Sequence, residues 1–329
     1  MIKDKILIVK ELKKLYPFTR GLFWSKPLYV KAVDGISFEI NKGEIFGLIG
    51  ESGCGKTTVG KLILRIIDKT EGEVLFKKQD IFRMKKDELR ELRQKIQMIF
   101  QNPYEVLEPR LTTFKILSEP LEFHFPTLSD REKMERVKEV LFSVDIKPPE
   151  SFLLKHSFEL SGGQLQRIAI ARSLILNPEF LVADEPVSML DTSIRAGILK
   201  LLLKLKKEND MTYLFISHDL AISKFICDRL AVMYLGKVVE EGPSGKVLNE
   251  PLHPYTKALR MALPLLDPGR KYYLNVPKYI RGEIPNAINI PQGCRFHPRC
   301  PYSETICSRE EPKLIEFGQN RKVSCHLPL

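Results

Sequence analysis

The stretch Gly50-Glu51-Ser52-Gly53-Cys54-Gly55-Lys56-Thr57 decides how the rest of the chain is interpreted. It fits the pattern G-x-x-x-x-G-K-[ST], in which the glycines let backbone N–H groups wrap around phosphate oxygens. The lysine then reaches the outer phosphates of a nucleotide, and the threonine hydroxyl reaches Mg²⁺. The residues that we expect to bind the nucleotide here are Gly50, Ser52, Gly53, Cys54, Gly55, Lys56, Thr57 and Thr58.

The sequence on either side of this loop has the pattern that such a loop requires. Ile45–Ile49 is an apolar run that predicts a buried strand leading directly into the loop. A helix is predicted from Thr57, with apolar residues at helical spacing as far as Ile67. Before the loop, the first 40 residues alternate in the way of antiparallel strands. Strand, glycine loop and helix together predict an α/β fold around a phosphate site.

A second candidate site follows a later apolar strand, Phe180–Asp184. Asp184 and Glu185 form an acidic pair at its end, and such a pair on its own is usually an exposed turn. The phosphate loop upstream favours function instead. Asp184 is expected to hold Mg²⁺ through water, and Glu185 to polarise the attacking water. The helix 193–209 and the strand Thr212–Ser217 are predicted to continue the α/β part.

Residues 102–177 are expected to be mostly helical. Ser129 and Glu132 have the spacing of a capping box, and the apolar residues after them share one helix face. Ser161 and Gln164 have the same spacing, which predicts that a further helix begins there.

The composition is that of an ordinary globular protein, with 43% apolar and 28% charged residues in 329. The length fits one large domain or two. A net charge of +11 suggests an anionic partner, which could be nucleic acid, the inner face of a membrane or the nucleotide itself. A lysine-rich solvated surface explains the charge equally well, and the spread of basic residues along the chain argues against one nucleic-acid patch.

The apolar stretches are far shorter than the roughly 20 residues of a membrane-spanning helix. The N-terminus does not lead into the apolar core of a secretory signal. We therefore expect a cytoplasmic protein.

Four of the six cysteines lie near the end of the chain with the spacing C-x5-C-x6-C-x17-C, namely Cys294, Cys300, Cys307 and Cys325. Disulfides are not expected in a cytoplasmic chain. Four thiolates could bind zinc or a [4Fe–4S] cluster, although zinc sites usually have C-x2-4-C pairs, and unligated structural cysteines are the alternative. Proline becomes frequent beyond about Glu250, which predicts an appended module without long helices.

The stretch Leu160-Ser161-Gly162-Gly163-Gln164, together with the phosphate loop, resembles the ABC-type ATPases over nearly the whole chain. The resemblance implies an ABC-type P-loop ATPase core with an antiparallel β subdomain and a helical subdomain. It also implies that Ser161, Gly162, Gly163 and Gln164 face the γ-phosphate bound by the opposite subunit, so that two chains share ATP. A helix N-terminus favours an anion at this position because its N–H groups and dipole are oriented toward it.

The same resemblance assigns further residues. Gln101, after the predicted strand 97–100, matches the Q-loop glutamine that contacts Mg²⁺ or water. His218 matches the switch histidine that touches the γ-phosphate, and Asp191 matches the D-loop residue that crosses the dimer interface. Tyr16 is the expected adenine-stacking aromatic, with Phe18 as its competitor.

The tail narrows the resemblance to ATP-binding subunits of oligopeptide/dipeptide permeases. It is carried by 293–301, by His253-Pro254-Tyr255-Thr256, and by 215–220 and 231–236. The N-terminal stretch from Lys14-Leu15-Tyr16-Pro17 to Gly35 looks closer to the F-type subunit than to its D-type partner. In that family the four tail cysteines are associated with a [4Fe–4S] cluster. The implied boundaries are an ABC domain at 1–250, with its helical subdomain at about 102–177, and a C-terminal module at 251–329.

The implied function is ATP hydrolysis that powers the import of peptides; some members of the group serve oligosaccharides or nickel instead. The implied partners are a second ATP-binding subunit of the D-type, two membrane permease subunits and an extracellular binding protein, at the cytoplasmic face of the membrane. A soluble ABC ATPase acting on nucleic acid is the alternative of another class. Such proteins usually carry two cassettes or large insertions, so we expect no nucleic-acid partner.

Overall fold

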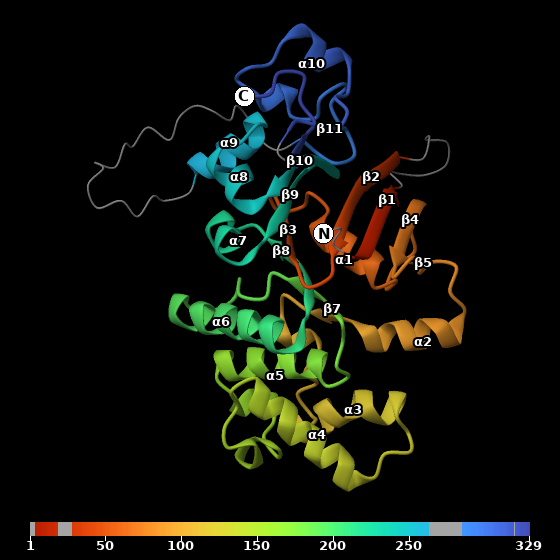
Figure 1. Cartoon of the computed structure of the whole chain (residues 1–329), viewed down its shortest axis with the longest axis vertical. Coiled ribbons are helices and arrows are strands. Elements are labelled where there is room, and N and C mark those ends of the chain that lie inside the picture. The colour runs from red at the N-terminus through yellow and green to blue at the C-terminus, as the bar shows by residue number, and fades with distance from the viewer. Residues whose placement is uncertain (1–3, 19–27, 263–284, 319) are drawn as a thin grey trace, which may run out of the picture. The chain divides into compact units, whose positions relative to one another are not determined.

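The computed structural model describes residues 4–18, 28–262, 285–318 and 320–329 (Figure 1). The chain forms two compact units. The first unit consists mainly of Arg83–Phe215 together with Asn41–Glu44. The second unit consists of the described residues of Lys5–Ile40, Ile45–Phe82 and Ile216–Leu329. Each unit thus contains parts that lie far apart in the sequence.

One sheet of the second unit is antiparallel, with the strand order β2-β1-β4-β5. Its strands are β1 (Lys5–Phe18), β2 (Leu28–Asn41), β4 (Glu71–Phe76) and β5 (Gln79–Asp80). Val9 of β1 pairs with Val74 of β4, and both side chains are buried. Alternate residues of a strand face the same side, so the two valines lie on the buried face of this sheet. The antiparallel strands predicted for the first 40 residues are confirmed.

The second unit also contributes a mixed sheet in the order β11-β12-β10-β9-β3. β3 (Ile45–Ile49) runs parallel to β9 (Arg229–Tyr234), which is antiparallel to β10 (Lys237–Pro243). The short strands β12 (Lys322–Val323) and β11 (Ile315–Glu316) extend the sheet beyond β10. The end of the chain is therefore part of the sheet that carries the phosphate loop.

The helices of the second unit are short. They are α1 (Lys56–Ile63), α7 (Leu220–Ile226), α8 (Ser244–Asn249), α9 (Pro254–Met261), α10 (Thr305–Arg309) and the 3-10 turn η4 (His297–Arg299). α1 ends at Ile63, earlier than the apolar spacing through Ile67 predicts. Arg65 has a φ of 48°, and this left-handed conformation ends a helix.

The first unit contains three strands in the order β8-β7-β6. β6 (Ile96–Ile99) is parallel to β7 (Phe180–Asp184), and β8 is Thr212–Ser217. The strand predictions 180–184 and 212–217 are confirmed at both ends, because fully buried apolar runs are a strong strand signal.

The first unit contains the segment 102–177, which was predicted to be mostly helical. The helices of this unit are α2 (Lys86–Lys95), α3 (Thr113–His124), α4 (Asp130–Ser143), α5 (Gly162–Leu174) and α6 (Thr192–Asn209), with 3-10 turns η1 (Pro103–Glu105), η2 (Pro149–Phe152) and η3 (Ser157–Glu159). α3, α4 and α5 pack on one another (Figure 1). The predicted capping boxes at Ser129 and Ser161 are both confirmed.

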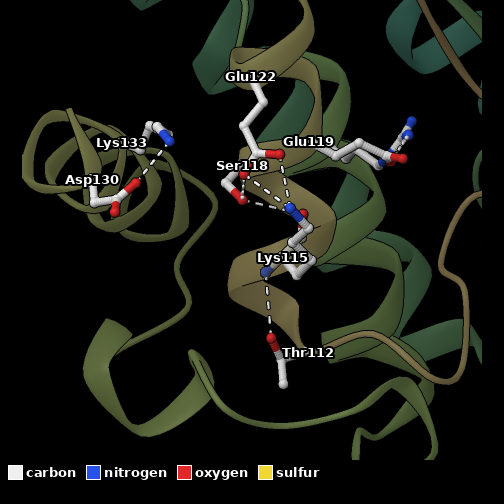
Figure 2. A network of polar contacts seen from close by, with 8 residues as sticks. Thr112, Lys115, Ser118, Glu119, Glu122, Asp130 and Lys133 are labelled. Carbon is white, nitrogen blue, oxygen red and sulfur yellow. Dashed lines mark hydrogen bonds and ion pairs between the residues drawn. The ribbon is translucent and has the colours of Figure 1, made fainter. Parts of the chain in front are cut away.

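Exposed ion pairs lie on the surface of these packed helices (Figure 2). The Lys115 ammonium bonds both Glu122 oxygens at 3.0 and 2.7 Å, and Arg172 of α5 bonds Glu119 of α3 at 3.1 Å. Such exposed pairs contribute only about 0.2–1 kcal/mol each. Burial of apolar residues such as Leu117 and Leu141 is therefore the main term that holds the helices together, at about 1.5–3 kcal/mol per side chain.

Within the described ranges, no helix has the length and apolar character that crossing a membrane requires.

Candidate nucleotide site

The phosphate loop lies between β3 and α1, as its motif demands. Gly55 has a φ of 107° and immediately precedes α1. A Cβ atom at this position would come within 2.0 Å of the Ala32 carbonyl oxygen, so only glycine fits the backbone here. Of the other predicted binding residues, Ser52, Gly53 and Thr57 are exposed and Thr58 is half-buried.

Lys56 lies against the loop that it follows. Its side-chain ammonium donates to the carbonyl oxygens of Gly50 at 2.8 Å and Glu51 at 3.0 Å, and the Cys54 Sγ lies at 3.8 Å. Burial raises the pKa of the Cys54 thiol, although the nearby Lys56 charge opposes this shift. The thiol therefore stays protonated. An ammonium group has three donors, so Lys56 is held with its charge at the loop that the motif assigns to phosphate.

Glu51 is fixed from two sides by Tyr255 and Arg299, two residues of the tail motifs that were not predicted to lie at this loop. Its backbone N–H donates to the Tyr255 hydroxyl at 2.9 Å, and its carboxylate accepts two bonds from Arg299 at 2.9 and 3.2 Å. Burial opposes the charge on Arg299, but the bonds to Glu51 and Tyr234 outweigh it and raise the pKa of the guanidinium. Separations of 204 and 248 residues leave no local pattern that could have revealed these contacts.

The remaining predicted residues of the second unit lie on its surface. His218 is exposed directly after β8, and Asp219 then caps α7 by accepting from the N–H groups of Ala221 and Ile222. Tyr16 and Phe18, the two candidates for adenine stacking, are 37% and 40% exposed near the end of β1. Their similar exposure leaves the choice of Tyr16 a prediction.

In the first unit, Gln101 and Glu185 come together. Gln101 follows β6 and Glu185 follows β7, and the Gln101 amide donates to a Glu185 carboxylate oxygen at 3.2 Å. The two strands are parallel neighbours, so their carboxyl ends meet at one edge. Asp184, the last residue of β7, is 2% exposed. Glu185 has a φ of 46°, a conformation that is costly for a residue other than glycine and that recurs at functional sites.

Gln166 connects this edge to the signature helix, and the sequence analysis missed it. It is 1% exposed, and its side-chain amide donates to the Pro186 carbonyl oxygen at 2.8 Å. A glutamine just over one turn into a helix is an unusual residue type for a buried position, and the structure alone shows that this one is buried.

The signature itself begins α5. The Gln164 side chain accepts from the Ser161 N–H at 3.0 Å, and Ser161 Oγ accepts from the Gln164 N–H at 3.4 Å. Ser161 and Gly162 are exposed and Gly163 is half-buried, so this helix start faces solvent in the single chain.

Asp191 lies before α6. It occupies the N-cap position, is exposed, and makes no side-chain capping bond within the described part of the chain. Arg195 instead holds the preceding loop by donating to the Leu190 carbonyl oxygen at 2.6 Å. Asp191 is therefore open to solvent, and its assignment to the D-loop stays a prediction.

The four tail cysteines line one small cavity of the second unit, together with Phe296, His253 and His297. Burial raises the pKa of Cys294 and of Cys325 to about 11 each, and the neighbouring cysteines add to the rise. Among the described residues, however, no three or more His, Cys, Asp or Glu side chains are placed to hold a metal ion. The four cysteines thus share a cavity without the geometry of a loaded metal site.

Comparison with known proteins identifies the family. Residues 33–188 match the ABC transporter family, and residues 239–307 match the C-terminal region of oligopeptide/dipeptide transporters. The chain is 45% identical over 326 residues to the oligopeptide transport ATP-binding protein AppF of Bacillus subtilis, covering 99% of this chain and 98% of that protein. It is 42% identical to the dipeptide transport ATP-binding protein DppF of Haemophilus influenzae, covering 95% and 94% of the two chains.

Solved structures indicate the same family. A dimeric bacterial ABC transporter cassette aligns with a TM-score of 0.63 at 31% identity, covering 72% of this chain and 98% of the cassette. A component of an ABC transporter complex from Clostridium perfringens aligns with a TM-score of 0.64 at 29% identity, covering 75% and 92%. The expected ABC-type α/β core is confirmed. The chain therefore belongs to the ABC transporter family of ATPases, in the group that carries the oligopeptide/dipeptide transporter C-terminal region.

Proposed function

We propose that this chain hydrolyses ATP to power the import of peptides through a membrane ABC transporter. The observation that carries the proposal is similarity along 99% of the chain to an oligopeptide transport ATP-binding protein, with the tail included. The tail matters because the ABC core is common to transporters of many substrates, whereas the matched C-terminal region is named for peptide transport.

In the second unit, the phosphate loop is the proposed cradle for the ATP phosphates. Lys56 supplies positive charge to the outer phosphates, and Thr57 supplies a hydroxyl ligand for Mg²⁺. His218 is the proposed contact to the γ-phosphate, and Tyr16 the proposed contact to adenine. The support is the glycine-dependent loop geometry and the ammonium held within it.

In the first unit, Glu185 is the proposed group that polarises the attacking water, with Gln101 and Asp184 as ligands toward Mg²⁺ or its waters. Mg²⁺ supplies charge neutralisation of the phosphates when it is bound. The Gln101–Glu185 bond supports this assignment, because it orients the carboxylate by a neutral amide donor and leaves its charge intact. Ser161, Gly162, Gly163 and Gln164 are proposed to face ATP held by another chain, and Asp191 to cross the interface.

This arrangement requires a second ATP-binding subunit. We assign the chain to the F-type, because relatives named AppF, OppF and DppF are 42–45% identical to it, and its proposed partner is a D-type subunit. Two permease subunits and an extracellular binding protein complete the proposed importer, with this chain bound peripherally at the cytoplasmic face. The proposed domain boundaries remain 1–250, with a helical subdomain at 102–177, and 251–329.

The tail cysteines Cys294, Cys300, Cys307 and Cys325 are the proposed ligands of a [4Fe–4S] cluster, with Zn²⁺ as the alternative. The support is that four thiols line the same cavity. Because burial raises the pKa of Cys294 and of Cys325 to about 11, binding a metal must release protons from these two thiols and draw the four side chains together. Iron and zinc analysis of anaerobically purified protein distinguishes a cluster, a zinc site and neither.

The transport function is tested by reconstituting this chain with permease and D-type subunits in lipid vesicles. Labelled peptides should be taken up with ATP, and Glu185→Gln in the same complex should abolish uptake while the complex still assembles. Oligosaccharide and nickel uptake are measured in parallel. Binding to DNA or RNA in place of permease subunits would instead support the nucleic-acid alternative.

A further inference from the structure

Arg299 connects the C-terminal module to the phosphate loop within the second unit. Its two terminal nitrogens each bond one oxygen of the Glu51 carboxylate, at 2.9 and 3.2 Å. The Arg299 side chain is 7% exposed and that of Glu51 is 23% exposed. A two-pronged bond from a planar guanidinium fixes the direction of a carboxylate as well as its distance.

Arg299 is itself held rigidly by an aromatic cluster formed by Tyr234, Tyr255 and Phe296. It donates to the Tyr234 hydroxyl at 3.2 Å, and its guanidinium lies 5.7 Å from the Tyr234 ring centre and 5.9 Å from that of Phe296. The three rings are buried and contact one another at centroid distances of 4.7 to 5.4 Å. Ile49, the last residue of β3, belongs to the same core cluster.

Glu51 in turn bears on the lysine of the loop. Its carbonyl oxygen accepts from the Lys56 ammonium at 3.0 Å, and its own N–H is held by Tyr255. The Glu51 carboxylate is also a negative charge within a loop built to bind anions, so without a partner it would repel phosphate. Arg299 neutralises that charge and holds the Glu51 carboxylate against the C-terminal module.

We propose that Arg299 is a positioning residue for nucleotide binding, because it orients the Glu51 carboxylate and cancels its charge. The ATP affinity of the phosphate loop therefore depends on the C-terminal module. Arg299 ends η4 and directly precedes Cys300, so a change in how residues 294–300 are folded would move it. By reciprocity, ATP binding should in turn stabilise these residues.

The test measures ATP affinity of the full chain by calorimetry for Arg299→Gln, for Arg299→Gln combined with Glu51→Gln, and for Arg321→Gln. Arg321 is the matched control, since it is a buried arginine of the same module whose bonds go to Glu240, at 2.8 Å, and to the Glu250 carbonyl. Arg299→Gln should weaken ATP binding about tenfold, because a charged bond is lost and a repelling carboxylate is left. Arg321→Gln should stay within about twofold of the wild type.

The ATP affinity of the double variant, Arg299→Gln with Glu51→Gln, is the most decisive measurement. Removing the Glu51 charge as well should restore affinity to within about threefold of the wild type, because the repulsion is gone. A double variant as weak as Arg299→Gln alone, or equal affinities for Arg299→Gln and Arg321→Gln, would overturn the proposal.

Hydrogen exchange provides a readout that does not depend on turnover. ATP should slow exchange of residues 294–300 in the wild type and in Arg321→Gln, but not in Arg299→Gln. If Arg299→Gln does not fold, Arg299→Lys keeps the charge without the two-pronged geometry. The nucleotide-free Arg299→Lys chain should then exchange faster at residues 50–56 than Arg321→Gln, and equal rates would count against Arg299.

Discussion

The two compact units each carry part of the predicted ATP-binding machinery, but they hold it by different kinds of contact. In the first unit, Gln101 and Glu185 meet because they follow neighbouring parallel strands, and Ser161 caps the helix that it begins. In the second unit, Glu51 is held by Tyr255 and Arg299 from the far end of the chain. The first set follows from the rules of strand pairing and helix capping, whereas the second depends on contacts with the C-terminal module.

This difference predicts different failures. Changes in the first unit should affect chemistry or local helix stability while the remainder of the chain stays folded. Changes in the second unit should reach nucleotide affinity through distant residues.

Glu185→Gln should have the largest effect. Turnover should fall by about 10²-fold or more, because an amide cannot polarise the attacking water, while ATP affinity is retained since the phosphate loop is unchanged. Steady-state hydrolysis by the assembled transporter and ATP binding are measured on the same preparation. Glu208→Gln, an exposed change on α6 of the same unit, serves as the control. Normal hydrolysis by Glu185→Gln would remove its catalytic assignment.

Lys56→Ala should act on affinity instead. Removing one charged contact to phosphate should weaken ATP binding by about 10- to 100-fold. Calorimetry compares it with Lys61→Ala, which removes a lysine in the last turn of the same helix. Equal affinities for the two variants would count against the phosphate-loop assignment.

Cys300→Ser should loosen the C-terminal module more than it slows hydrolysis. Replacing a thiol in an apolar cavity with a hydroxyl costs about 1–3 kcal/mol, and any bound metal would be lost as well. Anaerobic wild-type protein should be brown and contain about four irons per chain if the cluster is [4Fe–4S], and the variant should be colourless. Stoichiometric zinc without iron would reject the cluster, and four freely titrating thiols without either metal would reject both.

Ser161→Ala should have the smallest effect on stability. Loss of the cap of α5 costs about 1 kcal/mol, and a thermal melt of the single chain should register it as a shift of a few degrees. Ser129→Ala, at the other predicted capping box, is the matched control for stability. If the signature faces ATP of a second chain, only Ser161→Ala should also weaken ATP-dependent dimerisation.

The elements around the motifs were predictable from particular residues. The apolar runs 45–49 and 180–184 became β3 and β7 with the predicted bounds, since each side chain in them is buried. The capping boxes at Ser129 and Ser161 marked helix starts, because the cap bonds span only three residues. The end of α1 was missed, because Ile66 has helical spacing yet is 51% exposed after the left-handed Arg65.

The positions of the phosphate-loop motif, the signature stretch and the acidic strand end could be predicted from the residues alone, because backbone geometry of this kind demands fixed residue types at fixed short spacing. The contacts of Gln166 with Pro186 and of Arg299 with Glu51, 248 residues away, form only when distant parts of the chain fold together. A side chain that acts through a docked neighbour needs only the right charge and length at the point of contact. Its position in the sequence is then set by how the chain folds back, and no local pattern records it.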